Sequence, residues 1–250
     1  MKRCNKGFLG LYLMTAGLVA CGGGGDGGNA GNTSGTGTQY DFVPPIVNSS
    51  RVYSETIVDN SNNTIEGIGY METVRSVAAN GVITEEQQST NNAGGTVNGT
   101  NYSILTETQT YNNFGRETGF TYTESDGNPG SCIYAPYEGG PMPPLTVGQT
   151  WQIDWTETCN ANPAIQYSQQ GTVVDVESVT VPGGTFTALK LQSTTVWTDS
   201  NGTTHTQTTT NWLDTASFHS VKQSITYVDS GTPPVDGYAV SRQVELQSSS

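Results

Sequence analysis

Short runs in which apolar and polar residues alternate fill most of the chain after Tyr40. In the clearest of them, residues 151–156, Trp151, Ile153 and Trp155 share one parity and polar residues hold the other. This period of two is typical of a β-strand with one buried face. No stretch of the sequence keeps the 3.6-residue period of a helix. The pattern therefore predicts an all-β fold of antiparallel strands.

Turn residues separate these runs and predict hairpins between them. Asn80-Gly81 lies between two alternating runs and is a strong signal for a two-residue turn. Pro182-Gly183-Gly184 separates a β-branched run, residues 179–181, from an apolar strand that begins at Phe186. Hairpins of this kind place consecutive strands side by side and antiparallel.

A change of parity predicts one irregularity in the strand before this turn. Val174 and Val176 share a parity that Val179 and Val181 do not. One extra residue in a strand swaps its two faces. A bulge or break is therefore expected near Glu177-Ser178.

Glycine and proline interrupt the alternating pattern between Ser125 and Pro144. This stretch is expected to be a long loop that contains Cys132. The half of the chain before it is too poor in aliphatic residues to form a core of its own. We therefore expect one antiparallel β domain over residues 39–250, with a possible sub-boundary at 125–144.

The start of the chain has the order of a bacterial lipoprotein signal. A basic segment, residues 2–6, precedes an apolar stretch, residues 8–20, that is too short to span a bilayer comfortably. Leu18-Val19-Ala20-Cys21 then resembles the bacterial lipobox. The resemblance implies that residues 1–20 are a cleaved signal peptide and that Cys21 is acylated. The alternative is an ordinary secretory signal with a chance cysteine.

Residues 22–38 consist almost entirely of Gly, Asn, Ser and Thr. Such a composition cannot pack and predicts a flexible tether after the lipidated Cys21. Gly22 stands where an Asp would favour the inner membrane in the sorting system of Gram-negative bacteria. We therefore expect a cell-envelope protein held in the outer membrane by acyl chains on Cys21.

The charge of the chain excludes some partners. Its net charge is −13, and only six of its nine basic residues lie after the leader, where they are widely scattered. Nucleic-acid binding needs clustered Lys and Arg, so a nucleic-acid partner is not expected. The same scarcity excludes an electrostatic membrane patch. Twelve Tyr and four Trp can bury large areas, so we expect a folded body in spite of the low aliphatic content.

Two motifs in the second half carry a family resemblance. Residues 144–151 (Pro-Leu-Thr-Val-Gly-Gln-Thr-Trp) and 179–186 (Val-Thr-Val-Pro-Gly-Gly-Thr-Phe) precede a strand that ends in Trp212. They resemble uncharacterised bacterial envelope β-domain families with a P-L-x-V-G-x-x-W … V-x-V-P-A-G-x-F pattern, although Gly183 replaces the usual Ala. The resemblance implies an antiparallel wrapped sheet or half-barrel, similar to envelope lipoprotein carriers. It implies no catalytic residues.

Two cysteines remain once the leader is removed and Cys21 is acylated. In an oxidising envelope compartment, Cys132 and Cys159 predict one disulfide. Two free thiols are an alternative. A metal-binding pair is disfavoured because no histidine lies near either cysteine in the sequence.

Residues with catalytic or metal-binding potential fit ordinary strand and turn positions better. His205 and His219 lack a Gly-x-Ser-x-Gly elbow and are interpreted as solvated strand or turn residues. Asp154 and Glu157 are the nearest candidates for glycosidase acids, but both are expected to point outward from a strand. Residues 59–66 resemble a calcium loop but lack its sixth-position Gly, so a hairpin turn is expected. We expect no enzyme, no cofactor and no metal.

The tryptophans are the remaining candidates for a ligand site. Trp151, Trp155, Trp197 and Trp212 either line a groove or belong to the ordinary core. The leading hypothesis is a lipid-anchored envelope protein that binds an apolar or acyl ligand. The alternative is a surface or structural lipoprotein that engages protein or glycan partners through its Thr-, Asn- and Gln-rich strands. A hydrolase is a distant third hypothesis.

Overall fold

The computed structural model describes residues 37–89, 95–97, 100–102, 104–113, 115–124, 129–160, 162–200, 202–230 and 239–250. The predicted signal peptide, the acylated Cys21 and nearly all of the tether lie outside these residues. Within them, no helix is long and apolar enough to cross a membrane.

The described chain is built from β-strands. Their bounds are β1 (Ser50–Asp59), β2 (Thr64–Val77), β3 (Ile83–Ser89), β4 (Gly95–Val97), β5 (Thr100–Tyr102), β6 (Ile104–Tyr111), β7 (Glu117–Glu124), β8 (Pro129–Ala135), β9 (Thr150–Cys159), β10 (Ile165–Val181), β11 (Gly184–Thr198), β12 (Thr204–Asp214), β13 (Ser220–Asp229) and β14 (Ala239–Ser249). The all-β prediction is confirmed.

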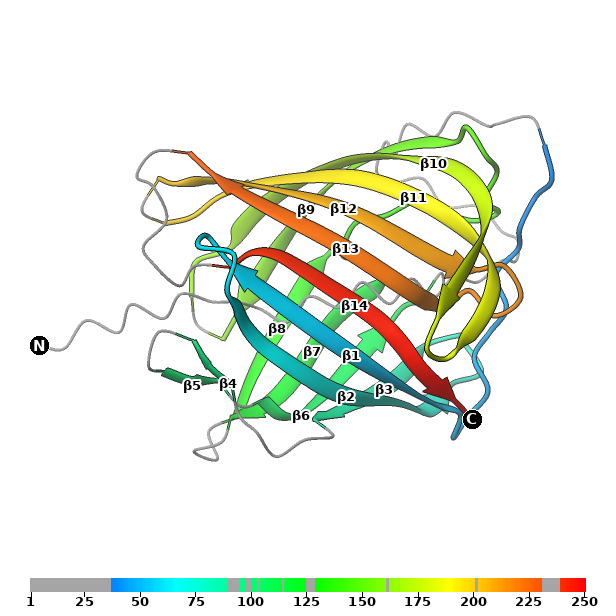
Figure 1. Ribbon diagram of the computed structural model, residues 1–250, viewed down its shortest axis with the longest axis horizontal. Coiled ribbons are helices and arrows are strands. Elements are labelled where there is room, and N and C mark those ends of the chain that lie inside the picture. The colour runs from blue at the N-terminus through cyan, green and yellow to red at the C-terminus, as the bar shows by residue number, and fades with distance from the viewer. Residues whose placement is uncertain are drawn as a thin grey trace, which may run out of the picture.

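Twelve of these strands form one closed antiparallel barrel (Figure 1). The order around it is β1-β14-β13-β12-β11-β10-β9-β8-β7-β6-β3-β2, and β4 pairs only with β5 in a small separate sheet. The predicted wrapped sheet is therefore confirmed, and it closes completely. The closing pair joins the first strand to the last, with Tyr53 opposite Leu246 and Glu55 opposite Val244. Closure leaves no strand edge of the barrel unpaired.

The predicted hairpins form, because their turn residues allow tight reversals. Gly81 has a φ of 82° between β2 and β3. Pro182 and Gly183 connect β10 to β11, and Val181 pairs with Gly184. The end of this long hairpin bends over to β14, where Gly183 N–H donates to the carbonyl oxygen of Leu246 (2.9 Å; Figure 1).

The bulge predicted near Glu177-Ser178 lies elsewhere. Pairing between β10 and β11 is continuous from Asp175 to Val181, and the extra residue is Val174. The parity change that suggested the bulge has another cause. Where the hairpin bends over the barrel end, the face of β10 that points outward elsewhere becomes buried. Val179 on this face belongs to the same apolar cluster as Tyr53 and Tyr70.

The prediction of a long loop around Cys132 is also wrong in part. Residues 129–135 form β8, which pairs with β7 and β9. A real loop follows from Pro136 to Gln149, next to β9. Strands before and after residues 125–128 therefore belong to the same barrel.

A segment that we call the strap, residues 37–49, crosses one end of the barrel, here called the strap end. Tyr40 exchanges backbone hydrogen bonds with Leu145, just before β9. Further on, the N–H of Asn48 donates to the carbonyl oxygen of Val74 on β2 (2.8 Å). Between these points Phe42 is buried, with its ring edge-on to Phe218 (centroids 6.2 Å apart). The strap thus covers this end with apolar side chains.

Two apolar clusters stabilise the barrel. The larger contains Phe42, Val74, Ile83, Tyr111, Tyr134, Leu145, Trp151, Ile153, Trp155, Tyr167, Val173, Leu189, Leu191, Leu213 and Phe218. The smaller lies under the bent hairpin and contains Tyr53, Tyr70, Val179, Val181, Ala188, Val221, Val244 and Leu246. Inward-facing positions outside these clusters hold polar residues, described below.

Gly171 gives a test of the packing inside the barrel. A Cβ at this position would lie 2.2 Å from the indole ring of Trp151, its partner on β9. Gly171→Ala should displace that ring and cost about 1–3 kcal/mol of the free energy of unfolding. The melting temperature should fall by roughly 2–12 °C. Gly37→Ala is the control, because nothing lies within 4 Å of its Cβ position. Equal melting temperatures for both variants would contradict the packing described.

Candidate functional site

The inside of the barrel is strongly polar. Along several strands the inward positions carry acids, amides and arginines. The buried strand residues of this set are Arg51, Glu55, Glu72, Glu85, Gln87, Glu107, Gln109, Glu117, Glu157, Gln169, Gln207, Asn211, Gln223 and Arg242. Arg116 and Glu138 are buried beside them in a turn and a loop. Such residues are rarely buried unless they are paired. The polar interior is therefore the candidate functional region of the protein.

Two arginines are paired with buried carboxylates. Arg242 Nη2 on β14 lies 2.7 Å from Glu55 Oε2 on β1, across the closing strand pair. Arg51 Nη2 lies 2.8 Å from Glu85 and 3.6 Å from Glu72. Both arginines and all three glutamates are almost completely buried. Each pair compensates charges that would be very costly alone.

Burial raises the pKa values of four interior carboxyl groups, including that of Glu72 beside Arg51. Burial raises the pKa of Glu72 and of Glu138 to about 8, and that of Glu107 to about 7. Burial likewise raises the pKa of Glu117 well above its usual range, and the nearby Glu138 adds to the rise. Loss of hydration disfavours the charged form of an acid. At neutral pH a large share of these groups is therefore uncharged.

Arg116 lies beside a small cavity within the barrel. This residue immediately precedes β7, and only 4% of its surface is exposed. Its Nη1 donates to the carbonyl oxygen of Gly139 (3.3 Å). Among the described residues, its Nε and Nη2 have no hydrogen-bond partner. Burial lowers its pKa to about 10, so the guanidinium keeps its charge at neutral pH.

The cavity has a volume of about 40 Å³. A space of this size holds a few water molecules or one small polar group. Its lining combines charged, amide, hydroxyl and aromatic groups. The residues around it are Gly115, Arg116, Glu117, Glu138, Gly139, Gly140, Pro141, Trp151, Gln169, Leu191, Ser193, Thr209 and Asn211.

Gly140 lets the loop before β9 lie directly on the guanidinium. It has a φ of 126°, which side chains rarely adopt. A Cβ there would lie 2.1 Å from Arg116 Nη1. The loop therefore fixes one side of the cavity through a position that only glycine fits well.

Three of the four predicted tryptophans face the interior. Trp151 lines the cavity, and its Nε1–H donates to Gln169 Oε1 (2.9 Å). Trp155 and Trp197 belong to a row of rings that crosses β9 to β12. Trp212 lies on the opposite face of β12, with the ammonium groups of Lys190 and Lys222 over its ring.

The aromatic row consists of four rings on adjacent strands. Trp155 stacks on Tyr167 (centroids 5.2 Å apart), Tyr167 lies 5.4 Å from Trp197, and Trp197 stacks on His205 at 5.0 Å. Tyr167 O–H also donates to Glu157 Oε2 (2.5 Å). Aromatic neighbours of this kind stabilise a fold beyond their buried area.

The histidines are less exposed than the sequence suggested. His205 Nδ1 lies 2.7 Å from Asp229 Oδ1, and its side chain is only 16% exposed. His219 contacts Arg51, and burial together with this cation lowers the pKa of His219 well below its usual value. The interpretation of both residues as solvated is wrong, because each lies against other side chains that replace water.

Asp154 and Glu157 lie on opposite faces of β9. Asp154 is exposed, as expected, but Glu157 is buried in the barrel, so the outward placement predicted for Glu157 is wrong. The two residues are three positions apart, and an odd spacing along a strand reverses the face. They do not form a carboxylate pair.

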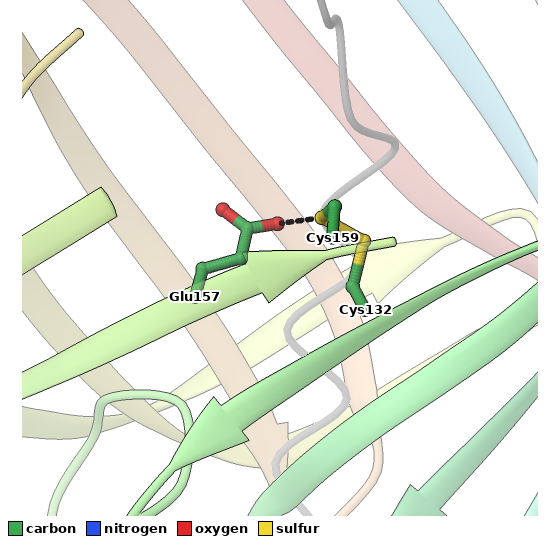
Figure 2. Close-up of side chains that lie close together, drawn as sticks. All are labelled: Cys132, Glu157 and Cys159. Carbon is green, nitrogen blue, oxygen red and sulfur yellow. Dashed lines mark hydrogen bonds between the residues drawn. A yellow bond between two sulfur atoms is a disulfide. The ribbon is translucent and has the colours of Figure 1, made fainter. Parts of the chain in front are cut away.

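The predicted disulfide joins Cys132 on β8 to Cys159 on β9. In Figure 2, Glu157 points from β9 toward the two sulfur atoms, and its Oε1 lies 3.2 Å from Cys159 Sγ. The possible ligand atoms of these three residues lie within 4.8 Å of one another. Because the sulfurs are bonded to each other, they offer no thiolate to a metal. The bridge stabilises the fold by about 3–4 kcal/mol on the loop-entropy model.

The calcium-like segment is a hairpin turn, as predicted. Asp59 Oδ1 accepts hydrogen bonds from the N–H groups of Ser61 and Asn63 (2.8 Å each). Asn62 has a φ of 61°, a conformation that asparagine tolerates in turns. The Asp59 carboxylate is thus engaged by the backbone of its own turn.

Sequence reasoning named Trp151 but missed the charged residues around the cavity. Arg116, Glu117 and Glu138 lie next to glycines of a turn and a loop, where no alternation of apolar and polar residues indicates which side chains are buried. Other interior polar residues did leave a signal. Glu85 and Gln87 share the parity of a buried Ile83 in β3, which marks an inward polar stripe.

Comparisons with known proteins show distant structural likeness. No family model and no curated protein matches the chain. A presumed lipoprotein of Parabacteroides distasonis matches with 13% identity and a TM-score of 0.48, over 83% of this chain and 97% of that one. A presumed exported protein with a YmcC-like fold from Bacteroides fragilis matches with 12% identity and a TM-score of 0.48, over 85% and 100%. The hypothetical lipoprotein YmcC of Escherichia coli matches with 11% identity and a TM-score of 0.38, over 78% and 85%. At TM-scores below 0.5 we draw no functional conclusion from them.

The raised carboxyl pKa values predict how stability depends on pH. The pKa of Glu138 is near 4.5 in the unfolded chain and about 8 in the folded protein. Between these two pH values the folded state keeps a proton that the unfolded state has released. Stability should therefore fall as pH rises from 5 to 9. Glu138→Gln imitates the protonated acid, so it should reduce this fall by about 1 kcal/mol or more.

Urea unfolding at pH 5, 7 and 9 measures this effect. Asp154→Asn is the matched control, because it removes an exposed carboxylate from the outer face of β9. The control should keep the wild-type slope. If the free energy of unfolding falls with pH equally in Glu138→Gln and in wild type, Glu138 is already ionised at neutral pH.

Proposed function

We propose that this protein is a lipid-anchored component of the bacterial envelope whose barrel binds a small polar ligand group. The anchor is Cys21 in the sequence Leu18-Val19-Ala20-Cys21, with Gly22 favouring the outer membrane. The binding position is the cavity beside Arg116. We propose that the ligand is bound and not chemically changed, and we assign no residue a catalytic role.

One observation carries the binding proposal. The guanidinium of Arg116 is buried beside a cavity, and in the described part of the chain neither Nε nor Nη2 has a hydrogen-bond partner. Leaving buried donors unpaired is costly, and for a charged group the cost is larger. A ligand group that accepts hydrogen bonds, such as a carboxylate or an amide carbonyl, would remove that cost.

A polar ligand fits the interior better than the apolar or acyl ligand that the sequence suggested. An acyl chain beside Arg116, Glu117 and Glu138 would exclude water and give these groups no hydrogen bonds in return. The second described cavity is smaller, about 10 Å³, and it too has charged residues in its lining, Arg51 and Glu85. Neither cavity has the form of an acyl-chain tunnel.

The test is to identify small molecules that co-purify with the full-length protein. The protein is purified from membranes in mild detergent and denatured, and the released polar molecules are identified by mass spectrometry. Wild type and Arg75→Met should release the same compound, because Arg75 is an exposed residue paired with Glu86. Arg116→Met should release little of it, because the donors that hold the ligand are gone.

Other outcomes would overturn the proposal. An equal amount of the compound from all three proteins would place the ligand elsewhere. No compound from any of them would favour the alternative, a lipoprotein that engages protein or glycan partners. The intact mass of the same samples tests the anchor, because acylation at Cys21 adds the mass of the acyl chains.

A further inference from the structure

Exposed apolar side chains are concentrated in the strap. Val43, Ile46 and Val47 are all exposed, and Ile46 reaches 77%. Pro44 between them is exposed as well. A soluble surface normally scatters such residues singly, and a contiguous group marks an interaction surface.

Two further valines extend this surface at the strap end. Val147 is exposed in the loop whose Leu145 pairs with Tyr40 of the strap. Val174, the bulged residue of β10, is also exposed and follows Val173, which accepts a hydrogen bond from the N–H of Gly148. The strap end therefore carries exposed apolar groups from three segments of the chain.

The tether joins the body at this same end. Residues 22–38 connect Cys21 to the strap, which runs along one end of the barrel in Figure 1. The Gly-rich composition of these seventeen residues predicts a root-mean-square reach of roughly 23 Å. Acyl chains on Cys21 would thus keep the strap end close to the bilayer that holds them.

We infer that the strap end rests on the lipid bilayer, with Val43, Ile46 and Val47 inserted at the interface. This inference rests on the proposed anchoring through Cys21. A short flexible linker gives an effective concentration in the millimolar range, so a few apolar side chains suffice for a contact that would be weak between separate partners. The barrel then stands on the membrane with its other end, which carries His205, directed away from it.

The charges indicate the kind of bilayer surface. Asp41 is the only charged residue between positions 37 and 50. The chain as a whole has a net charge of −13, so an anionic surface would repel it. The contact is therefore hydrophobic, fits a zwitterionic lipid surface, and should persist when the salt concentration is raised.

A fluorescent probe at position 46 tests this contact in the intact lipidated protein. In Ile46→Cys of the proposed mature lipoprotein, the new thiol is the only free one, because the leader with Cys4 is removed, Cys21 is acylated and Cys132 is bonded to Cys159. An environment-sensitive dye on it should shift to shorter wavelength in phosphatidylcholine vesicles. Lipids that carry quenchers on their acyl chains should quench it several times more strongly than a water-soluble quencher does.

Val228→Cys is the matched control. Val228 is an exposed valine (67%) near the end of β13, opposite Thr206 of β12 and remote from the strap. A dye there should keep its emission in water and respond only to the water-soluble quencher. Equal responses at positions 46 and 228 would overturn the inference.

A second arm separates this inference from the proposed anchoring. If the intact mass shows no acyl chains, the anchoring proposal fails by itself. The chain from Cys21 onward is then coupled through Cys21 to a maleimide lipid in the same vesicles. The dye is attached at residue 46 or 228 through an introduced alkyne-bearing amino acid, which does not react with the maleimide, and the two positions are compared. Selective lipid quenching at position 46 would still support the contact, and its loss in Val43→Ser/Val47→Ser would assign it to the strap.

Discussion

The compensation of charge inside a closed barrel is the constraint on which this structure depends. Closing the sheet turns every second residue of each strand inward, and many of these residues are acids, amides or arginines. Arg242 and Glu55 meet across β14 and β1, the pair of strands that closes the barrel. Because removal of one partner leaves an uncompensated buried charge, the interior fixes which strands can close on each other.

This polar interior also decides what the protein can do. The larger apolar cluster reaches from Phe42 of the strap to Trp155 and Tyr167, and the smaller one lies under the bent hairpin. Both cavities described above are small and have charged groups in their lining, which suits an acyl chain poorly. What remains is a small cavity with a charged guanidinium on one side and carboxyl groups of raised pKa beside it. In our proposals, by contrast, the membrane meets the protein from outside, through the tether and the strap. The proposed ligand and the proposed anchor therefore use different parts of the barrel.

Local features of this fold could be predicted from the sequence, and long-range ones could not. Alternation at Trp151, Ile153 and Trp155 gave the strand and its buried face, and the two remaining cysteines gave the disulfide. Closure brings together Arg242 and Glu55, which are 187 residues apart and share no local pattern. The buried face of Glu157 followed from its spacing to Trp155 and was open to prediction. The Arg116 cavity was not, because its charged residues lie in or next to a turn and a loop without a period that indicates a face. Residues of β9 to β12 complete its lining from distant parts of the sequence.

A double-mutant cycle on Arg242 and Glu55 tests the central claim most directly. If the pair compensates two buried charges, Arg242→Met and Glu55→Gln should each lower the free energy of unfolding by about 3–5 kcal/mol, and the double variant should lose much less than their sum. The half-buried surface pair Lys222 and Glu245 should show a coupling of about 0–1 kcal/mol in the same experiment. Small, additive losses at Arg242 and Glu55 would contradict the account.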